Sequence, residues 1–154
     1  MGTDDFFKKR RAERKKRKYE YRQANTNSFL IVTEGEKTEP LYFKGIQKKI
    51  KEKMNGRIDI VEAPVIDIYG KGCGTGKLIE TTEQLVKDSK ILYQNVWIVF
   101  DKDDFEDFDE AIRLGKEKGY QIAWSNQSFE YWLYLHFNYG DTALHRDNWY
   151  EKLD

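Results

Sequence analysis

The sequence is poor in cysteine, histidine and long apolar runs, and each shortage excludes a class of protein. Its single cysteine, Cys73, cannot form an internal disulfide, and its two histidines are too few to support a zinc site. The longest uncharged apolar runs, such as residues 96–100 (VWIVF), are far too short to cross a bilayer. The basic N-terminus is not followed by the apolar core of a signal peptide. These shortages favour a cytoplasmic protein that does not enter a membrane.

The chain does contain enough apolar residues for one folded domain. It has 154 residues, of which 39% are hydrophobic and 15% aromatic, although 35% are charged. The zero net charge hides an asymmetry, because residues 1–24 hold ten Lys or Arg and four Asp or Glu, a net charge of +6. The remaining residues hold 17 and 23, a net charge of −6. We therefore divide the chain into a basic N-terminal extension, residues 1–26, and an α/β domain, residues 27–154.

The basic tract at residues 8–18 (KKRRAERKKRK) is a candidate for binding a polyanion such as nucleic acid. Within it, Lys15, Lys16 and Arg17 are candidate substrate-binding residues. The alternative is a solvated helix or a disordered tail, which the repulsion between like charges also favours.

Strands and helices alternate along the rest of the sequence. Strands are expected at residues 28–33 (SFLIVT), at 57–69 with a break near Pro64, at 95–101 (NVWIVFD) and at 120–125. Helices are expected from about residue 38 to the Asn55-Gly56 break, at 77–90 with Leu78, Leu85 and Val86 inward, and at 105–118, closed by Gly119. Ser128 is positioned to cap a last, core-forming helix at 129–137 that would pack His136 inside. This order predicts a compact, three-layer α/β/α domain with a mostly parallel sheet.

Polar residues follow most of the predicted strands. In parallel α/β folds, ligands bind outside the carboxyl ends of the strands. Here those positions are Glu34, residues 70–76, residues 101–104 and residues 125–128. The site is therefore expected at this edge of the sheet.

Three carboxylates at this edge form the main chemical pattern. Asp101 ends a strand, Asp103 lies two residues further on, and Glu34 ends a different strand. Carboxylates on one side of an extended chain repel each other unless a cation lies between them, and hard oxygen ligands suit Mg²⁺ or Mn²⁺. Glu34 would either bind the metal or act as a general acid or base. The alternative is that these acids only cap turns and helices, which is common in α/β proteins.

The sequence motifs around these acids resemble those of known protein families. Residues 31–39 (IVTEGEKTE) followed by 99–103 (VFDKD) resemble the signature of TOPRIM domains, and the Thr38-Glu39 extension looks most like their nuclease branch, which includes the overcoming-lysogenization-defect nucleases. Residues 124–137 (WSNQSFEYWLYLHF), taken with both motifs and the basic tract, resemble the TOPRIM-related RloB-like family. Members of that family usually continue beyond the Trp- and Tyr-rich helix, so the resemblance implies either a truncated C-terminus or a short form.

The resemblance implies a metal-dependent nuclease, more probably of DNA than of RNA, that acts with a partner ATPase in phage defence. Glu34, Asp101 and Asp103 would be catalytic and metal-binding, and Glu39 and Glu130 would be further metal ligands. The alternative for Glu130 is a buried carboxylate satisfied by backbone donors at a helix start. The candidate substrate-binding residues in the domain are Asn126, Ser128, Lys37 and Lys102. Whether the chain forms a homo-oligomer is left open.

Three other interpretations compete with a nuclease. The first is a non-catalytic, nucleic-acid-binding TOPRIM module within an ATPase-containing defence complex. The second is a phosphoacceptor receiver domain, but residues 120–128 lack the lysine that a receiver needs after its last strand. The third is a P-loop at residues 70–77 (GKGCGTGK), but Lys71 stands where the first glycine belongs and Leu78 replaces the Ser/Thr that binds magnesium. The aromatic residues Trp124, Trp132, Tyr131 and Tyr134 are candidates for base stacking, but the segment at 129–137 is expected to form core instead.

Overall fold

A parallel sheet forms the centre of the molecule. The structure is a computed structural model of the chain and describes residues 23–24, 27–55, 64–102, 107–140 and 147–153. The four strands of the main sheet are β2 (Ser28–Thr33), β3 (Val65–Gly70), β5 (Asn95–Lys102) and β6 (Gln121–Asn126). They are hydrogen-bonded in the order β3-β2-β5-β6, and every pair is parallel. A second, two-stranded parallel sheet pairs β1 (Gln23–Ala24) with β4 (Ile91–Leu92).

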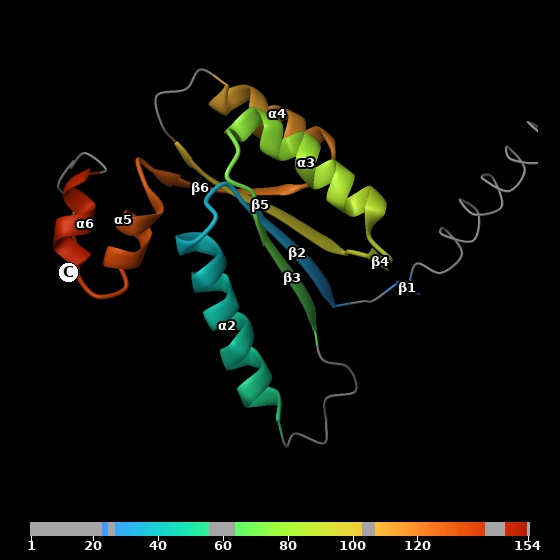
Figure 1. The fold of residues 1–154 in the computed structure, drawn as a ribbon, viewed down its shortest axis with the longest axis horizontal. Helices are drawn as coiled ribbons and strands as arrows, with labels where there is room; N and C mark the ends of the chain where they lie inside the picture. Colours follow the sequence, from blue (N-terminus) through green and yellow to red (C-terminus); the bar gives the residue numbers. More distant parts are fainter. Residues whose placement is uncertain (1–22, 25–26, 56–63, 103–106, 141–146, 154) are drawn as a thin grey trace, which may run out of the picture.

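Helices cover both faces of the main sheet, which confirms the predicted three-layer α/β/α fold. The helices are α2 (Thr38–Met54), α3 (Thr75–Asp88), α4 (Phe108–Glu117), α5 (Phe129–Tyr134) and α6 (Asp147–Leu153). Helices α3 and α4 pack together on one face of the sheet, whereas α2 lies against β3 and α5 against β6 on the other side (Figure 1). Helix α6 packs on α5, away from the sheet (Figure 1).

The hydrophobic core lies between the sheet and the pair α3 and α4. Alternate residues of the central strands point to this face, and Leu30, Val32, Ile98 and Phe100 are completely buried. Leu78 meets them from α3, and Leu85 and Val86 pack on the same cluster, as predicted from their helical spacing. Burying one such side chain contributes about 1.5–3 kcal/mol, so this layer supplies much of the driving force for folding.

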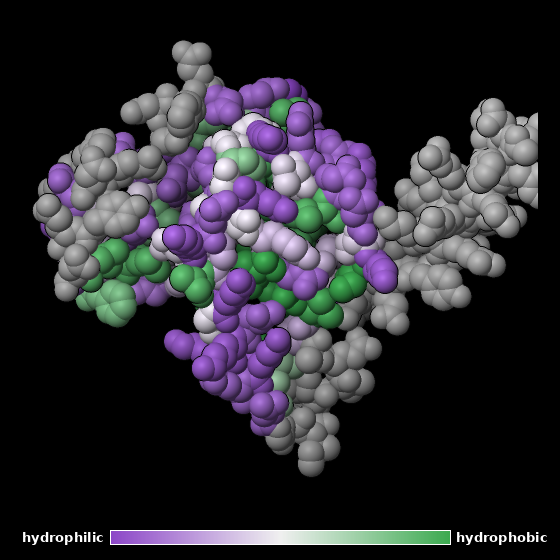
Figure 2. All heavy atoms as spheres, viewed as in Figure 1, coloured by the Kyte–Doolittle hydropathy of each residue, from purple (hydrophilic) through white to green (hydrophobic). Residues whose placement is uncertain are grey.

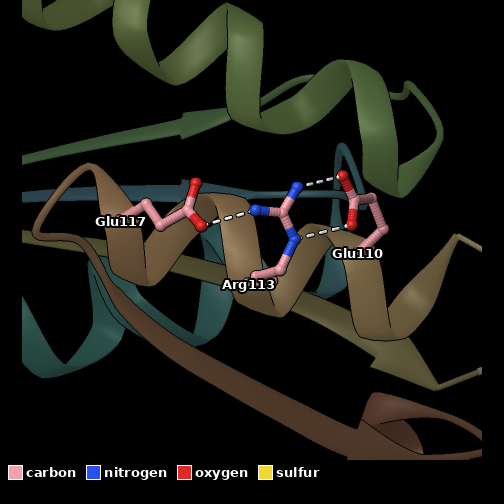
Figure 3. A network of polar contacts seen from close by, with 3 residues as sticks. All are labelled: Glu110, Arg113 and Glu117. Atoms are coloured by element: carbon pink, nitrogen blue, oxygen red, sulfur yellow. Dashed lines mark hydrogen bonds and ion pairs between the residues drawn. The ribbon is translucent and has the colours of Figure 1, made fainter.

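The exposed side of α4 carries a small ion-pair network (Figure 3). Arg113 donates from Nε to Glu110 at 2.9 Å and also binds Glu117 one turn further on. The Arg113 guanidinium lowers the pKa of the Glu110 carboxyl, because it hydrogen-bonds to the charged form. All three groups are in solvent, where ion pairs one turn apart support a helix only weakly.

Two predictions about the C-terminal part were wrong. The helix that starts at Phe129 ends at Tyr134 instead of Phe137, and it is not the last, because α6 follows it. His136 is exposed and Phe137 is 79% exposed, so this segment does not form core beyond its first turn. The physical reason is its location: α5 packs mainly on the edge strand β6 and on α6, and its first residue, Phe129, also contacts Tyr42 and Phe43 of α2. Tyr131 and Tyr134 pack on Trp149 of α6, which is 3% exposed.

Helix and strand boundaries elsewhere agree with the predictions to within a few residues. The strand at 95–101 is β5, which extends to Lys102, and the helix predicted at 77–90 is α3, which begins two residues earlier, at Thr75. Gly119 follows the end of α4 with φ +77°, a left-handed conformation that suits glycine. The predicted segment at 57–69 is represented by β3, and residues 56–63 lie outside the described residues.

Candidate acidic site at the carboxyl edge of the sheet

Glu34 and Asp101 lie side by side at the carboxyl edge of the sheet. They follow or end β2 and β5, which are neighbouring strands at the position where the strand order reverses. The backbone N–H of Glu34 donates to Val99 O at 2.9 Å, and the N–H of Asp101 donates to Glu34 Oε2 at 3.3 Å. Reversal points of this kind are where open parallel sheets bind ligands. The predicted pairing of these two strand ends is therefore confirmed.

The other oxygen of Glu34 is held by the start of α3. Thr75, the first residue of that helix, donates from Oγ to Glu34 Oε1 at 3.2 Å. The preceding loop folds back on β2, because Gly72 N donates to Glu34 O at 2.8 Å. Gly72 has φ +56°, a conformation that costs a residue with a side chain more than it costs glycine. The glycine-rich segment thus holds the Glu34 side chain in one orientation.

Asp101 is positioned from the opposite side by β6. Ser125 is its register partner in the parallel ladder, and the Ser125 hydroxyl donates to Asp101 Oδ1. Neither Thr75 nor Ser125 was singled out from the sequence. The signal was present, because both lie in segments that follow the strand-end rule, but only the register shows which side chains meet.

A polar pocket of about 440 Å³ opens at this edge. The titratable and hydroxyl-bearing residues that line it include Asp101, Glu39, Glu130, Ser128 and Lys37. Lys37 and Glu39 follow β2, Ser128 and Glu130 follow β6, and Asp101 lies near the end of β5. All five were predicted as site residues. The structure therefore brings together acids that are far apart in the sequence.

Glu39 is buried in the first turn of α2, where it is 7% exposed. Its Oε1 accepts a hydrogen bond from Gly35 N at 3.3 Å. The carboxylate lies so close to Gly35 that a Cβ at that position would overlap Glu39 Oε1 and Oε2. A side chain at position 35 would therefore displace the Glu39 carboxylate, which lies at the wall of the pocket.

Ser128 and Glu130 reach the pocket from the turn between β6 and α5. Gln127 in this turn has φ +70°, which is unusual for a residue with a side chain and costs conformational energy. Ser128 is the N-cap residue of α5, as predicted, but its hydroxyl makes no capping bond. Its Oγ is buried at 2% exposure and has no hydrogen-bond partner among the described residues. Glu130 lies in the first turn of α5 and is 8% exposed.

The donor set of this pocket fits a hard divalent cation in its chemistry. Its oxygens come from carboxylates and a hydroxyl, which are the ligands that Mg²⁺ and Mn²⁺ prefer. A buried hydroxyl such as that of Ser128 normally has a hydrogen-bond partner or binds an ion. Within the described ranges, however, no three Asp, Glu, His or Cys side chains are close enough to hold one ion together. Asp103, the third predicted acid, lies outside the described residues, as do Lys15, Lys16 and Arg17.

The remaining predicted residues lie around the pocket. Lys37 is exposed at its rim. Lys102 is exposed at the end of β5, with Nζ 5.4 Å from the ring centre of Phe108 and 5.9 Å from that of Trp124. Asn126 is exposed at the end of β6 and lines a neighbouring apolar groove instead of the acidic pocket. Lys102 and Asn126 would meet a ligand only if it extended beyond the pocket.

The fold and the pocket define a class: a parallel α/β domain with an acidic site at a reversal point of its sheet. A family model described as RloB-like protein matches residues 29–154. The chain belongs to the RloB-like family. Searches of curated proteins and of solved structures gave no match. Over the described residues, the chain has no helix with the length and apolar character needed to span a membrane.

Proposed function

We propose that this protein is a metal-dependent nuclease of the TOPRIM type that hydrolyses phosphodiester bonds in nucleic acid, with DNA preferred over RNA. The observation that carries the proposal is the meeting of Glu34 and Asp101 at the reversal point, beside a pocket that holds Glu39 and Glu130. Two further observations support it: the chain belongs to the RloB-like family, and residues 31–39 and 99–103 resemble TOPRIM motifs. Neighbouring carboxylates repel each other unless a cation lies between them, so this arrangement favours metal-assisted phosphate chemistry.

Each residue of the pocket has a distinct role in this proposal. Asp101 and Asp103 would hold Mg²⁺ or Mn²⁺ together with one pocket acid, Glu39 or Glu130, and Glu34 would either share that ion or move a proton at its carboxylate. A bound divalent ion supplies charge neutralisation at the scissile phosphate and a more acidic water. Thr75 and the Asp101 N–H keep the Glu34 oxygens in place, so that the carboxylate does not reorganise when the substrate arrives.

The positive charges would hold the nucleic-acid backbone. Lys37 and Lys102 lie at the edge that carries the acids, and the tract that contains Lys15, Lys16 and Arg17 would extend the contact. Binding through such contacts releases counterions, so affinity should fall steeply as salt increases. We further propose that the protein works in the cytoplasm, with a partner ATPase, in defence against phage.

Cleavage of labelled single- and double-stranded DNA and RNA, with Mg²⁺, Mn²⁺ or EDTA, tests the activity. The protein should be compared with Glu34→Gln and Asp101→Asn, which preserve shape and remove charge. Glu80→Gln is the matched control, because Glu80 is an exposed acid on α3 away from the pocket. We expect metal-dependent cleavage that falls at least about 100-fold in both site variants and is unchanged in the control.

The alternative is a non-catalytic nucleic-acid-binding subunit. It predicts binding to the same substrates without cleavage in any metal, both alone and after addition of a candidate partner ATPase. That result, obtained with folded protein, would replace the nuclease proposal with the binding module.

A further inference from the structure

An apolar groove of about 540 Å³ lies on the sheet face opposite α3 and α4. Its floor includes Ile31 and Trp97 from the central strands, and its walls include Phe43 and Ile46 from α2 and Trp132 from α5. Figure 2 shows hydrophilic side chains along the outer side of α2 and hydrophobic ones between α2 and α5. The groove is separate in character from the acidic pocket, which is lined mainly by polar groups.

The helices that form the walls of this groove are more exposed than helices that are packed on all sides of a sheet layer. Of the 17 residues of α2, only Glu39 and Pro40 are buried. Ile46 remains 39% exposed and Trp132 46% exposed. Central parallel strands are normally covered on both faces, and a helix in water derives most of its stability from packing its apolar side. A contiguous apolar surface of this kind is typical of a binding site for another protein element.

On the side of α2 that faces the groove, apolar residues are followed by lysines toward the C-terminal end of the helix. Tyr42 and Ile46 line the groove, and Lys49 and Lys53 follow Ile46 at spacings of three and seven residues. Residues at these spacings share one side of a helix. Both lysines are exposed. The groove therefore has an apolar part and a basic end.

We propose that this groove binds an amphipathic α-helix of a partner protein, one with an apolar stripe that ends in acidic residues facing Lys49 and Lys53. Helices of this type bind grooves through apolar anchors one turn apart, and flanking charges set orientation and choice of partner. The partner helix completes the layer that α2 and α5 leave open.

Two other occupants fit less well. A second copy, related by a twofold axis, would bring two copies of the same surface together, so that Lys49 and Lys53 of both copies add positive charge to one interface. Nucleobases stack on aromatic rings and use hydrogen bonds at their edges. The groove lining offers them the exposed amide of Asn126, but the Tyr42 hydroxyl is bound to His136 Nε2 at 3.2 Å and that of Tyr131 donates to Gly140 O at 3.0 Å. The Ser125 hydroxyl already donates to Asp101.

Two labelled synthetic 18-residue helical peptides with the same leucine stripe test the proposal by fluorescence anisotropy. One carries glutamates at its flanks and the other carries lysines. We expect the acidic peptide to bind at least about tenfold more tightly than the basic one at low salt. Ile46→Asp should weaken that binding at least about tenfold, because it puts a charge into an apolar contact. Leu41→Asp is the matched control: Leu41 is on the same helix, 67% exposed and outside the groove, so binding should not change.

A reciprocal change tests the charge assignment. Lys49→Glu combined with Lys53→Glu should reverse the preference, so that the basic peptide binds more tightly. Four outcomes would overturn the proposal: no binding to folded protein, equal binding of both peptides, equal effects of Ile46→Asp and Leu41→Asp, or an unchanged preference after charge reversal. An oligo(dT) affinity or a protein self-association that Ile46→Asp alone abolishes would assign the groove to nucleic acid or to a second copy instead.

Discussion

The backbone N–H of Asp101 donates to Glu34 Oε2 at 3.3 Å, although the two residues are 67 positions apart in the chain. The contact exists because β2 and β5 are adjacent and in register, Thr33 beside Val99, so that the chain leaves both strands at one level. Glu34 accepts a second hydrogen bond from Thr75, and the Asp101 carboxylate accepts one from Ser125. The site is therefore assembled by the sheet and by the two segments that flank it.

Thr75→Val should lower cleavage while leaving the fold intact. It removes one hydrogen bond to Glu34, a contribution of about 1 kcal/mol, so turnover should fall about fivefold. Thr75→Ser should restore most of the activity, because it keeps the hydroxyl. Thr81→Val is the control, since the Thr81 hydroxyl bonds only to Lys77 O on the same helix. If Thr75→Val and Thr81→Val had the same turnover, Thr75 would not position Glu34.

Gly70→Ala and Gly45→Ala should change stability in opposite directions. A Cβ at Gly70 would lie 2.6 Å from Gly35 O and 2.7 Å from Pro40 Cγ, so the loop that carries Glu34 must shift. We expect a loss of about 1–3 kcal/mol in the free energy of unfolding. Gly45 lies within α2 with open space around it, and alanine there should add about 0.5–1 kcal/mol. Urea denaturation measures both, and a neutral Gly70→Ala would contradict this packing.

Ser128→Ala should be nearly neutral in metal-free protein, within about 0.5 kcal/mol, because its buried hydroxyl has no partner among the described residues. Ser125→Ala provides the contrast and should cost about 1 kcal/mol, since it removes a hydrogen bond to Asp101. If Ser128 serves a bound cation, Ser128→Ala should also reduce the rise in Tm that Mn²⁺ produces. An identical Tm rise in wild type and Ser128→Ala would remove Ser128 from the site.

Tyr93 should make the protein less stable at high pH. Burial, together with a hydrogen bond from its hydroxyl to Asp67, raises the pKa of Tyr93 from 10.0 to about 12. The folded protein thus holds this proton more tightly than the unfolded chain does. Its contribution is fully present below about pH 10 and is lost as pH rises through about 12. Urea midpoints at pH 9–12 should fall less for Tyr93→Phe than for wild type, whereas Tyr139→Phe, at an 88% exposed position, should follow wild type. Parallel curves for all three proteins would contradict the burial of this hydroxyl.

Much of the fold was predictable because local patterns and tertiary packing agree. The run of apolar residues in β5 is long enough to need burial on both sides, and the Asn55-Gly56 break and Gly119 mark where helices stop. Parallel strands then bring their carboxyl ends to one edge, and Glu34 and Asp101 meet there because β2 and β5 are neighbours, which the sequence left open.

Other features of the structure depend on tertiary contacts that the hydrophobic periodicity of the sequence does not reveal. The apolar spacing at 129–137 is that of a core helix, but its neighbour is the edge strand β6, so His136 and Phe137 are exposed. The Thr75 and Ser125 hydroxyls reach the acids only through the register of the ladder and the path of the glycine-rich loop. Trp149 looks like part of a polar tail in the sequence, yet it packs under Tyr131 and Tyr134.

Direct binding of Mn²⁺, followed by the loss of the free-ion signal in electron paramagnetic resonance, tests most directly whether the carboxyl edge is a metal site. The account predicts saturable binding by wild type and Glu80→Gln, and binding at least about tenfold weaker in Asp101→Asn and Glu39→Gln at unchanged stability. Equal affinity in all four proteins, or no saturable binding by the folded wild type, would contradict it.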